Sequence, residues 1–235
     1  MNKQGNTYTI IYIAVMVCVV GAVLAWVSLT LKPKQDENIS IDKMQQMLNS
    51  LHVTSNPDNA MELYSKYVTN SFIINDKGEK LDGNAFDINV SAEIKKPQES
   101  RKLPVFVCNI DNSTKYILPV YGAGLWGPIW GYIAVNDDGS TIYGAYFSHQ
   151  GETPGLGAEI ATPAFSGQFN NKHLFKNGEF KPIAVLKKGK NPTEGEDYVD
   201  AISGGTITST GVQTMLKSCL SSYYVFLNNL NNNKD

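Results

Sequence analysis

The chain has 235 residues, of which 42% are apolar and 18% charged, so it is long enough for one domain with a sizeable core and additional segments. Its net charge of −2 and the lack of a basic block argue against a nucleic-acid-binding protein. Three cysteines and three histidines, none in a Cys-x-x-Cys or His cluster, offer no zinc or iron–sulfur site, and we expect no metal. A disulfide between Cys108 and Cys219 stays open.

The N-terminal segment 8–31 contains no charged residue. At about 1.5 Å per residue, a helix of this length crosses a hydrocarbon core of about 30 Å. A cleaved signal peptide is the alternative, but its apolar core is normally about 7–15 residues long and ends in a small-x-small site, which is missing here. We therefore expect a retained transmembrane helix over 8–31 after a short tail over 1–7. Charged residues flank both ends, so the positive-inside rule does not decide the orientation.

The part that follows the apolar segment has a polar start and then a helical pattern. We expect a linker over 32–41 and apolar residues at helical spacing over 41–68. We assign 32–80 to the linker and an N-terminal helical segment, and 81–230 to a globular domain. The Asn-rich end, 231–235, is expected to be a flexible tail.

Short β-branched and aromatic runs dominate 103–147, and two of them flank a turn sequence at 136–140 that predicts a hairpin. Another strand is expected within 180–190, and a closing amphipathic helix over 208–227. The predicted fold class is α+β. A single N-terminal transmembrane helix precedes an antiparallel or mixed sheet with flanking helices.

Small hydroxyl residues and glycines gather just before this last helix, in Ser203-Gly204-Gly205-Thr206-Ile207-Thr208. Such residues commonly cap the free N–H groups of a helix start. The same N–H groups also bind phosphate, and glycine lets the backbone approach a ligand closely. A threonine hydroxyl here could carry the phosphate covalently. No neighbour in sequence would activate it, so another enzyme would have to form the bond.

This hexapeptide resembles the flavinylation motif Ser/Thr-Gly-Ala-Thr/Ser-x-Thr of FMN-binding domains, in which the final threonine is esterified to the FMN phosphate. The resemblance implies that Thr208 is the attachment residue, with Ser203, Gly204, Gly205 and Thr206 around the phosphate. Gly205 departs from the usual alanine, which puts the efficiency of attachment in question.

Two further stretches are similar to the same family. "GETPGLGAEI" (151–160) looks like its Glu-Thr-Pro-Gly-Leu-Gly loop, and "YGAGLWGPIWGYIAV" (121–135) looks like the Gly-Leu-Trp segment of the C subunits of sodium-pumping NADH:quinone reductases. The G subunits of Rnf-type electron-transport complexes share the other features, and the Gly-Leu-Trp segment favours the C subunits. The resemblance implies that these two stretches also supply residues that contact the flavin: Leu125, Trp126, Glu152, Thr153, Gly155, Leu156 and Gly157. From the residues alone, a core tryptophan is an equal alternative for Trp126.

The resemblance implies a flavoprotein that holds FMN by a phosphodiester. It would relay electrons from NADH oxidation towards ubiquinone, coupled to Na⁺ export. The implied partners are the A, B, D, E and F subunits of the membrane complex and a flavin transferase. The implied location is the bacterial cytoplasmic (inner) membrane, with the short tail 1–7 cytoplasmic and the C-terminal domain periplasmic. A non-covalent FMN-binding module is the alternative. "GAGLWG" lacks the strand–helix context of a dinucleotide fingerprint, so we expect no catalytic residue and no NADH oxidation by this chain alone.

Overall fold

A computed structural model describes residues 6–232, and the chain divides into two compact units, 1–43 and 44–235. Helix α1 (Asn6–Ser50) forms the described part of the first unit and supplies the start of the second. Among the described residues it is the one helix long and apolar enough to cross a membrane, and its apolar side chains from Ile10 to Leu31 are exposed. Of the tail expected over 1–7, residues 1–5 lie outside the described part of the chain.

The segment 32–41, expected as a polar linker, is helical throughout and contains Pro33. Its polar residues support the helix locally. Lys32 and Asp36 form an i,i+4 ion pair of 2.9 Å, and the Ser40 hydroxyl donates to the Asp36 carbonyl oxygen. These contacts favour continuation of α1 where composition alone indicated a linker.

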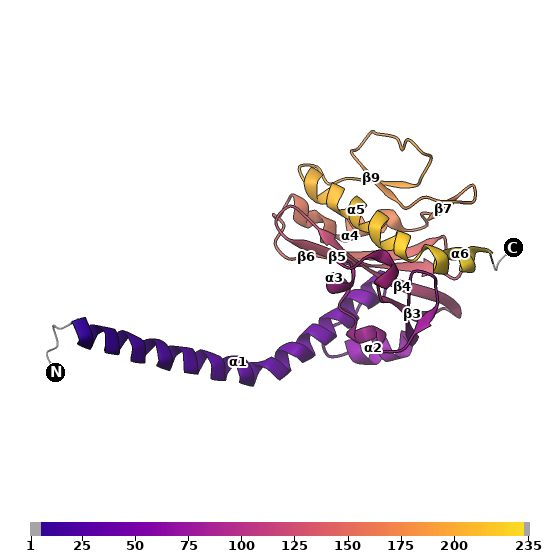
Figure 1. The fold of residues 1–235 in the computed structure, drawn as a ribbon. Helices are drawn as coiled ribbons and strands as arrows, with labels where there is room; N and C mark the ends of the chain where they lie inside the picture. Colours follow the sequence, from indigo (N-terminus) through magenta and orange to yellow (C-terminus); the bar gives the residue numbers. More distant parts are fainter. Residues whose placement is uncertain (1–5, 233–235) are drawn as a thin grey trace. The chain divides into compact units, whose positions relative to one another are not determined.

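The second unit is built on a six-stranded antiparallel sheet in the order β2-β1-β3-β4-β5-β6 (Figure 1). The strands are β1 (Val68–Ile74), β2 (Lys80–Leu81), β3 (Leu103–Ile110), β4 (Ser113–Ala123), β5 (Pro128–Asn136) and β6 (Ile142–His149). Two small pairs accompany this sheet: the antiparallel β7 (Phe175–Lys176) and β8 (Glu179–Phe180), and the parallel β9 (Ala184–Leu186) and β10 (Tyr198–Asp200). The main sheet and the β7–β8 pair are antiparallel and the β9–β10 pair is parallel, which agrees with the antiparallel or mixed sheet of the predicted fold class.

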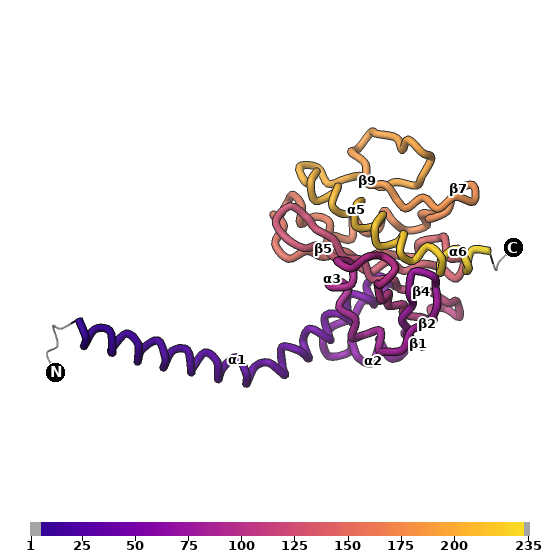
Figure 2. Tube along the Cα trace, in the orientation of Figure 1, coloured from indigo at the N-terminus to yellow at the C-terminus, as the bar shows by residue number. Residues whose placement is uncertain are grey.

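Helices flank the sheet. The α-helices are α2 (Ala60–Tyr67), α3 (Val90–Glu93), α4 (Pro163–Ser166), α5 (Thr206–Ser222) and α6 (Tyr224–Asn232). The 3₁₀ turns are η1 (Ala85–Asp87), η2 (Gln98–Ser100), η3 (Gly157–Ala161) and η4 (Gly167–Phe169). In Figure 2 the chain from β7 to β9 runs alongside α5. The predicted α+β class is confirmed.

Both faces of the sheet are buried. Successive strand residues point to opposite sides, so Val105 packs in one apolar cluster and Phe106 in another. The first cluster includes Val212, Leu216 and Leu220 of α5, and the second includes Met47 and Leu51 from the start of this unit. Burial on both faces explains why these strands are apolar almost without interruption.

The compact unit begins well before residue 81, where the globular domain was expected to start. Met47, Leu48 and Leu51 are 0–1% exposed, and β1 pairs with β3 inside the main sheet. The C-terminal helix also differs in detail from the expectation. It is interrupted at Tyr223, whose buried hydroxyl donates to the Pro104 carbonyl oxygen at 2.9 Å.

Cys108 and Cys219 are free, and they belong to the clusters on opposite faces of the sheet. The open disulfide alternative is therefore wrong. Burial raises the pKa of the Cys108 thiol to about 12 and that of Cys219 to about 11, although a backbone hydrogen bond with Tyr121 and the charge of Arg101 act in the opposite direction on Cys219. Both thiols stay protonated at neutral pH.

Candidate functional site

The three sequence motifs meet at one end of the main sheet. The β4–β5 turn, the loop after β6 and the start of α5 surround a cavity of about 390 Å³. Its lining residues are Leu125, Trp126, Glu152, Thr153, Leu156, Gly157, Gly204, Gly205, Thr206, Ile207 and Thr208. All of these except Ile207 were candidates from sequence. Ile207 occupies the variable position of the hexapeptide, which carried no signal.

The sheet topology explains this convergence. Because β5 pairs with β4 and β6 in antiparallel register, its first residues lie beside the end of β4 and the end of β6. The β4–β5 turn is closed by a 2.8 Å hydrogen bond from the Gly124 N–H to the Gly127 carbonyl oxygen. Helix α5 packs across β4, and this brings the hexapeptide to the same edge.

Two candidates lie outside this lining. Gly155 sits on the loop after β6 with φ of 73°, and its N–H donates to the Glu159 carboxylate at 3.0 Å. Ser203 is exposed and lines a neighbouring cavity of about 400 Å³, together with Lys187 and Lys188.

Glu152 connects the three segments. Its side chain is 4% exposed, and Oε2 accepts a hydrogen bond of 2.5 Å from Thr208 Oγ1. Oε1 accepts the Trp126 backbone N–H at 2.8 Å. Burial alone would raise the pKa of Glu152. The Thr208 hydroxyl and the N–H groups of Trp126, Leu125 and Gly127 outweigh burial and lower that pKa below its ordinary value. The carboxylate is therefore ionised at neutral pH.

His149, at the end of β6, holds the loop rather than facing the cavity. Its Nδ1 accepts the Glu152 backbone N–H at 3.2 Å. This contact gives His149 a structural role at the base of the loop.

Glycines allow the close approach of the three segments. A β-carbon on Gly157 would overlap both the Thr208 hydroxyl and the Glu152 carboxylate, and one on Gly124 would lie 2.5 Å from Glu152 Oε1. At Gly205, where the family motif has alanine, a β-carbon would lie 3.1 Å from Ile202 Cγ2 and 3.2 Å from the Gly157 nitrogen. Alanine at this position would require a shift of a few tenths of an ångström.

The hydroxyl residues do not serve as a helix cap. Residue Gly205 occupies the N-cap of α5, with no side-chain hydrogen bond to the first turn. The Ser209 hydroxyl instead accepts the Ile202 N–H at 3.0 Å, and Thr208 donates to Glu152. The capping interpretation is wrong. The N–H groups of the first turn have no side-chain cap, and such groups attract anions.

The rim of the cavity is apolar and open to solvent. Trp126 is 70% exposed, which rules out the alternative of a core tryptophan. Leu125, Leu156 and Ile207 are 49%, 42% and 58% exposed. Grouped exposed apolar side chains around a cavity indicate a ligand or partner site.

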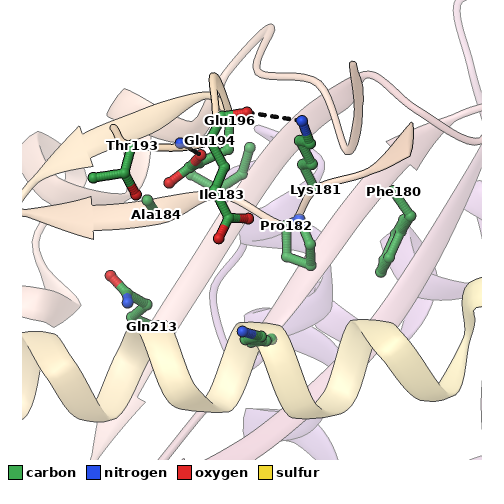
Figure 3. A pocket seen from close by; sticks show the side chains of 10 residues that line it. Phe180, Lys181, Pro182, Ile183, Ala184, Thr193, Glu194, Glu196 and Gln213 are labelled. Atoms are coloured by element: carbon green, nitrogen blue, oxygen red, sulfur yellow. Dashed lines mark hydrogen bonds between the residues drawn. The ribbon is translucent and has the colours of Figure 1, made fainter. Parts of the chain in front are cut away.

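A separate cavity of about 260 Å³ lies between α5 and the segment 180–196 (Figure 3). Two of its polar side chains are engaged within the chain: Lys181 Nζ donates to the Glu194 carbonyl oxygen at 2.8 Å, and Gln213 Oε1 accepts the Val185 N–H at 2.9 Å. It shares no residue with the motif-lined cavity.

Within residues 6–232 no cluster of three His, Cys, Asp or Glu side chains is arranged to hold a metal.

Comparisons with known proteins agree with this geometry. Residues 124–221 match the family model described as the FMN-binding domain. The Na(+)-translocating NADH-quinone reductase C subunit of Vibrio vulnificus is 33% identical, over 84% of this chain and 83% of that protein. The same subunit from Haemophilus ducreyi is 29% identical over 92% and 90%.

Solved structures give the same result. The crystal structure of the Na(+)-translocating NADH-quinone reductase C subunit from Parabacteroides distasonis superposes with a TM-score of 0.80 and 50% identity, and covers 84% of this chain and 96% of that one. Shewanella oneidensis NqrC gives a TM-score of 0.68 and 28% identity, over 82% and 98%.

Proposed function

The chain belongs to the family of Na(+)-translocating NADH-quinone reductase C subunits, and on this basis we propose that it carries FMN covalently at Thr208 and relays electrons in that membrane complex. The observation that carries the proposal is the position of the Thr208 hydroxyl. This residue is only 1% exposed, yet it lines the cavity in which all three motifs meet.

The donor set of the cavity fits FMN. A volume of about 390 Å³ falls in the range of about 300–1,000 Å³ common for small-molecule sites. The uncapped first turn of α5, with Thr206 and the backbone of Gly204 and Gly205, suits the phosphate. The apolar rim suits a planar ring system, which Trp126 would contact by stacking.

The remaining candidates surround the same space. We propose that Leu125, Trp126 and Leu156 contact the flavin ring. Thr153 and the backbone of Gly155 and Gly157 would form hydrogen bonds with the polar edge of the ring. Ser203, the exposed first residue of the hexapeptide, is assigned to the phosphate side. Glu152 orders these contacts, because it binds both Thr208 and the β4–β5 turn.

FMN supplies the electron-transfer chemistry, and the chain supplies position and electrostatics. A phosphodiester at Thr208 retains the cofactor through repeated electron exchange, while the rim residues restrict the ring. Gly122, Gly124 and Gly127 lie at the end of β4 and in the β4–β5 hairpin turn rather than between a strand and a helix, so they form no dinucleotide site. NADH oxidation and quinone reduction therefore belong to other subunits, and the chain alone is inactive.

The chain is a single-pass membrane protein of a membrane complex. We propose that α1 anchors it in the bacterial inner membrane and that its C-terminal domain is periplasmic. The proposed partners are the A, B, D, E and F subunits, in a complex that passes electrons to ubiquinone and exports Na⁺. A flavin transferase is a further partner, because a threonine hydroxyl is a poor nucleophile and attachment needs an activated flavin phosphate that is presented to it.

The experiment is co-expression with a flavin transferase followed by denaturing electrophoresis. The band should fluoresce under ultraviolet light, and Thr208→Ala should remove the fluorescence. Thr210→Ala is the matched control, because its hydroxyl lies in the same helical turn but donates to the Thr206 carbonyl oxygen. A band that loses its flavin on denaturation would support the non-covalent module instead.

A further inference from the structure

The hydrogen bond between Thr208 and Glu152 joins two buried side chains at the base of the cavity. Thr208 Oγ1 is the donor and Glu152 Oε2 the acceptor, at 2.5 Å, with 1% and 4% of the two residues exposed. A hydroxyl bound to a carboxylate forms a short, charge-assisted hydrogen bond. The Glu152 carboxylate is thus a proton acceptor in direct contact with Thr208 Oγ1, the atom that must lose its proton when the ester forms.

We propose that Glu152 is the general base for the modification of its own chain, accepting the Thr208 proton as the flavin phosphate is attached. This inference rests on the proposed function. The co-reactant is a flavin phosphoanhydride such as FAD, presented by the flavin transferase. The Oγ1–phosphorus bond forms, the phosphoanhydride P–O bond breaks, and the second phosphate leaves with the electron pair. The hydroxyl proton passes from Thr208 Oγ1 to Glu152 Oε2.

Charge balance in the product favours this role. A phosphodiester on Thr208 has no proton to donate, and it would place an anion beside a buried carboxylate. Like charges at this separation repel. A protonated Glu152 removes the repulsion and can donate a hydrogen bond to the new group. The transfer therefore converts an acceptor suited to the free threonine into a donor suited to the modified one.

Other bases near the loop are engaged elsewhere. His149 Nδ1 accepts the Glu152 N–H, and the Glu159 carboxylate accepts the Gly155 N–H. Three elements contact Glu152. From β6 the contact is His149, which is titratable. From α5 it is the Thr208 hydroxyl, and from the β4–β5 turn it is backbone N–H groups.

The test measures the initial rate of mass gain of the purified, unmodified full chain with flavin transferase and FAD. Glu152→Gln keeps size and an acceptor oxygen but is a far weaker base, so the rate should fall by about 10²-fold or more. Glu152→Asp should recover part of that loss. Glu159→Gln, which alters a carboxylate of the same loop without touching Thr208, should stay within about twofold of the parent rate.

The pH profile separates a base from a positioning residue. The parent rate should fall as Glu152 becomes protonated at low pH, and the Glu152→Gln rate should lack this decline. His149→Gln should retain the decline, which assigns it to Glu152. Thermal melting checks that each variant is folded. If Glu152→Gln is not folded, Glu152→Asp and the parent profile decide.

A Glu152→Gln rate equal to the parent rate would overturn the inference. So would a slow rate whose pH profile matches that of the parent, because that result indicates positioning only. A parent chain that gains no flavin mass would overturn the proposed function itself, and the two failures are thereby distinguishable.

Discussion

Gly211 of α5 and Ala123 at the end of β4 are in such close contact that a β-carbon on Gly211 would overlap the Ala123 carbonyl oxygen. Thr208 lies one helical turn before Gly211, and the Gly-Leu-Trp segment begins directly after Ala123. This contact therefore sets the distance between the attachment residue and one wall of the cavity.

Gly211→Ala should accordingly push α5 away from β4. We expect a loss of about 1–3 kcal/mol in the free energy of unfolding, as for other overpacked sites, and a lower yield of attached flavin. Gly167→Ala is the control, since a β-carbon there meets nothing within 4 Å and the backbone is helical. Equal denaturation midpoints for the two variants would show that the α5–β4 contact accommodates a β-carbon at residue 211, and would contradict this prediction.

Glu152 should make the unmodified chain sensitive to acid. Its pKa is lower in the folded chain than its ordinary value of 4.5, since burial, which raises it, is outweighed by the Thr208 hydroxyl and three backbone N–H groups. A carboxyl group whose pKa is lower in the folded than in the unfolded chain stabilises the fold at pH values above its unfolded pKa. This stabilisation is lost as the pH falls through the pKa of the folded chain. Below pH 4.5 the parent should therefore lose more stability than Glu152→Gln.

Urea unfolding at neutral pH and in steps below pH 4.5 measures this difference. Glu93 and Asp197 also have lowered pKa values and contribute to the acid response of both proteins, so the comparison is between parent and variant rather than of either alone. Parallel stability curves through that window would contradict the role assigned to the Glu152 hydrogen bonds.

Trp126 should restrict the flavin ring without being needed for its attachment. Its side chain is 70% exposed at the rim, remote from any role in the core. Trp126→Ala should carry flavin at the parental level, with brighter and less polarised fluorescence because ring stacking is lost. Trp130→Phe, which alters a tryptophan bound to Gln46 and outside the cavity lining, should leave both properties unchanged. Unaltered polarisation in Trp126→Ala would remove this residue from the ring site.

Met47 tests whether the end of α1 belongs to the globular core. It is fully buried against the sheet, so Met47→Ala should cost about 2–5 kcal/mol in the free energy of unfolding. Met61→Ala, at a position 58% exposed on α2, should change stability by no more than about 0.5 kcal/mol. Denaturant unfolding of the full chain in detergent compares them. Equal losses in the free energy of unfolding for the two variants would show that the end of α1 is not part of the core.

The sequence predicted the strands within 103–147, a strand within 180–190, the hairpin at 136–140 and the last helix, because their periodicity and turn residues are local signals. It did not predict β1 and β2, which lie where a helical segment and turns were expected. It missed the core role of Met47 and Leu51, because burial there depends on a sheet face formed by distant strands. It also placed a linker at 32–41, where the Lys32–Asp36 pair and neighbouring polar residues continue the helix.

The site shows the same division. The three motifs were visible in sequence as separate stretches, and their meeting in one cavity required the β4–β5–β6 register. Glu152 was expected only as a flavin contact, because its hydrogen bond to Thr208 spans 56 positions and follows from no local pattern. Ile207 was missed because a variable position in a motif gives no indication of its exposure.

Covalent attachment at Thr208 is tested by the mass of the chain purified from cells with an active flavin transferase, followed by mapping of its peptides. We predict a gain of FMN less one water, carried by the peptide that contains Thr208 and missing from Thr208→Ala. A colourless protein of unmodified mass, or a flavin bound to another peptide, would contradict this assignment.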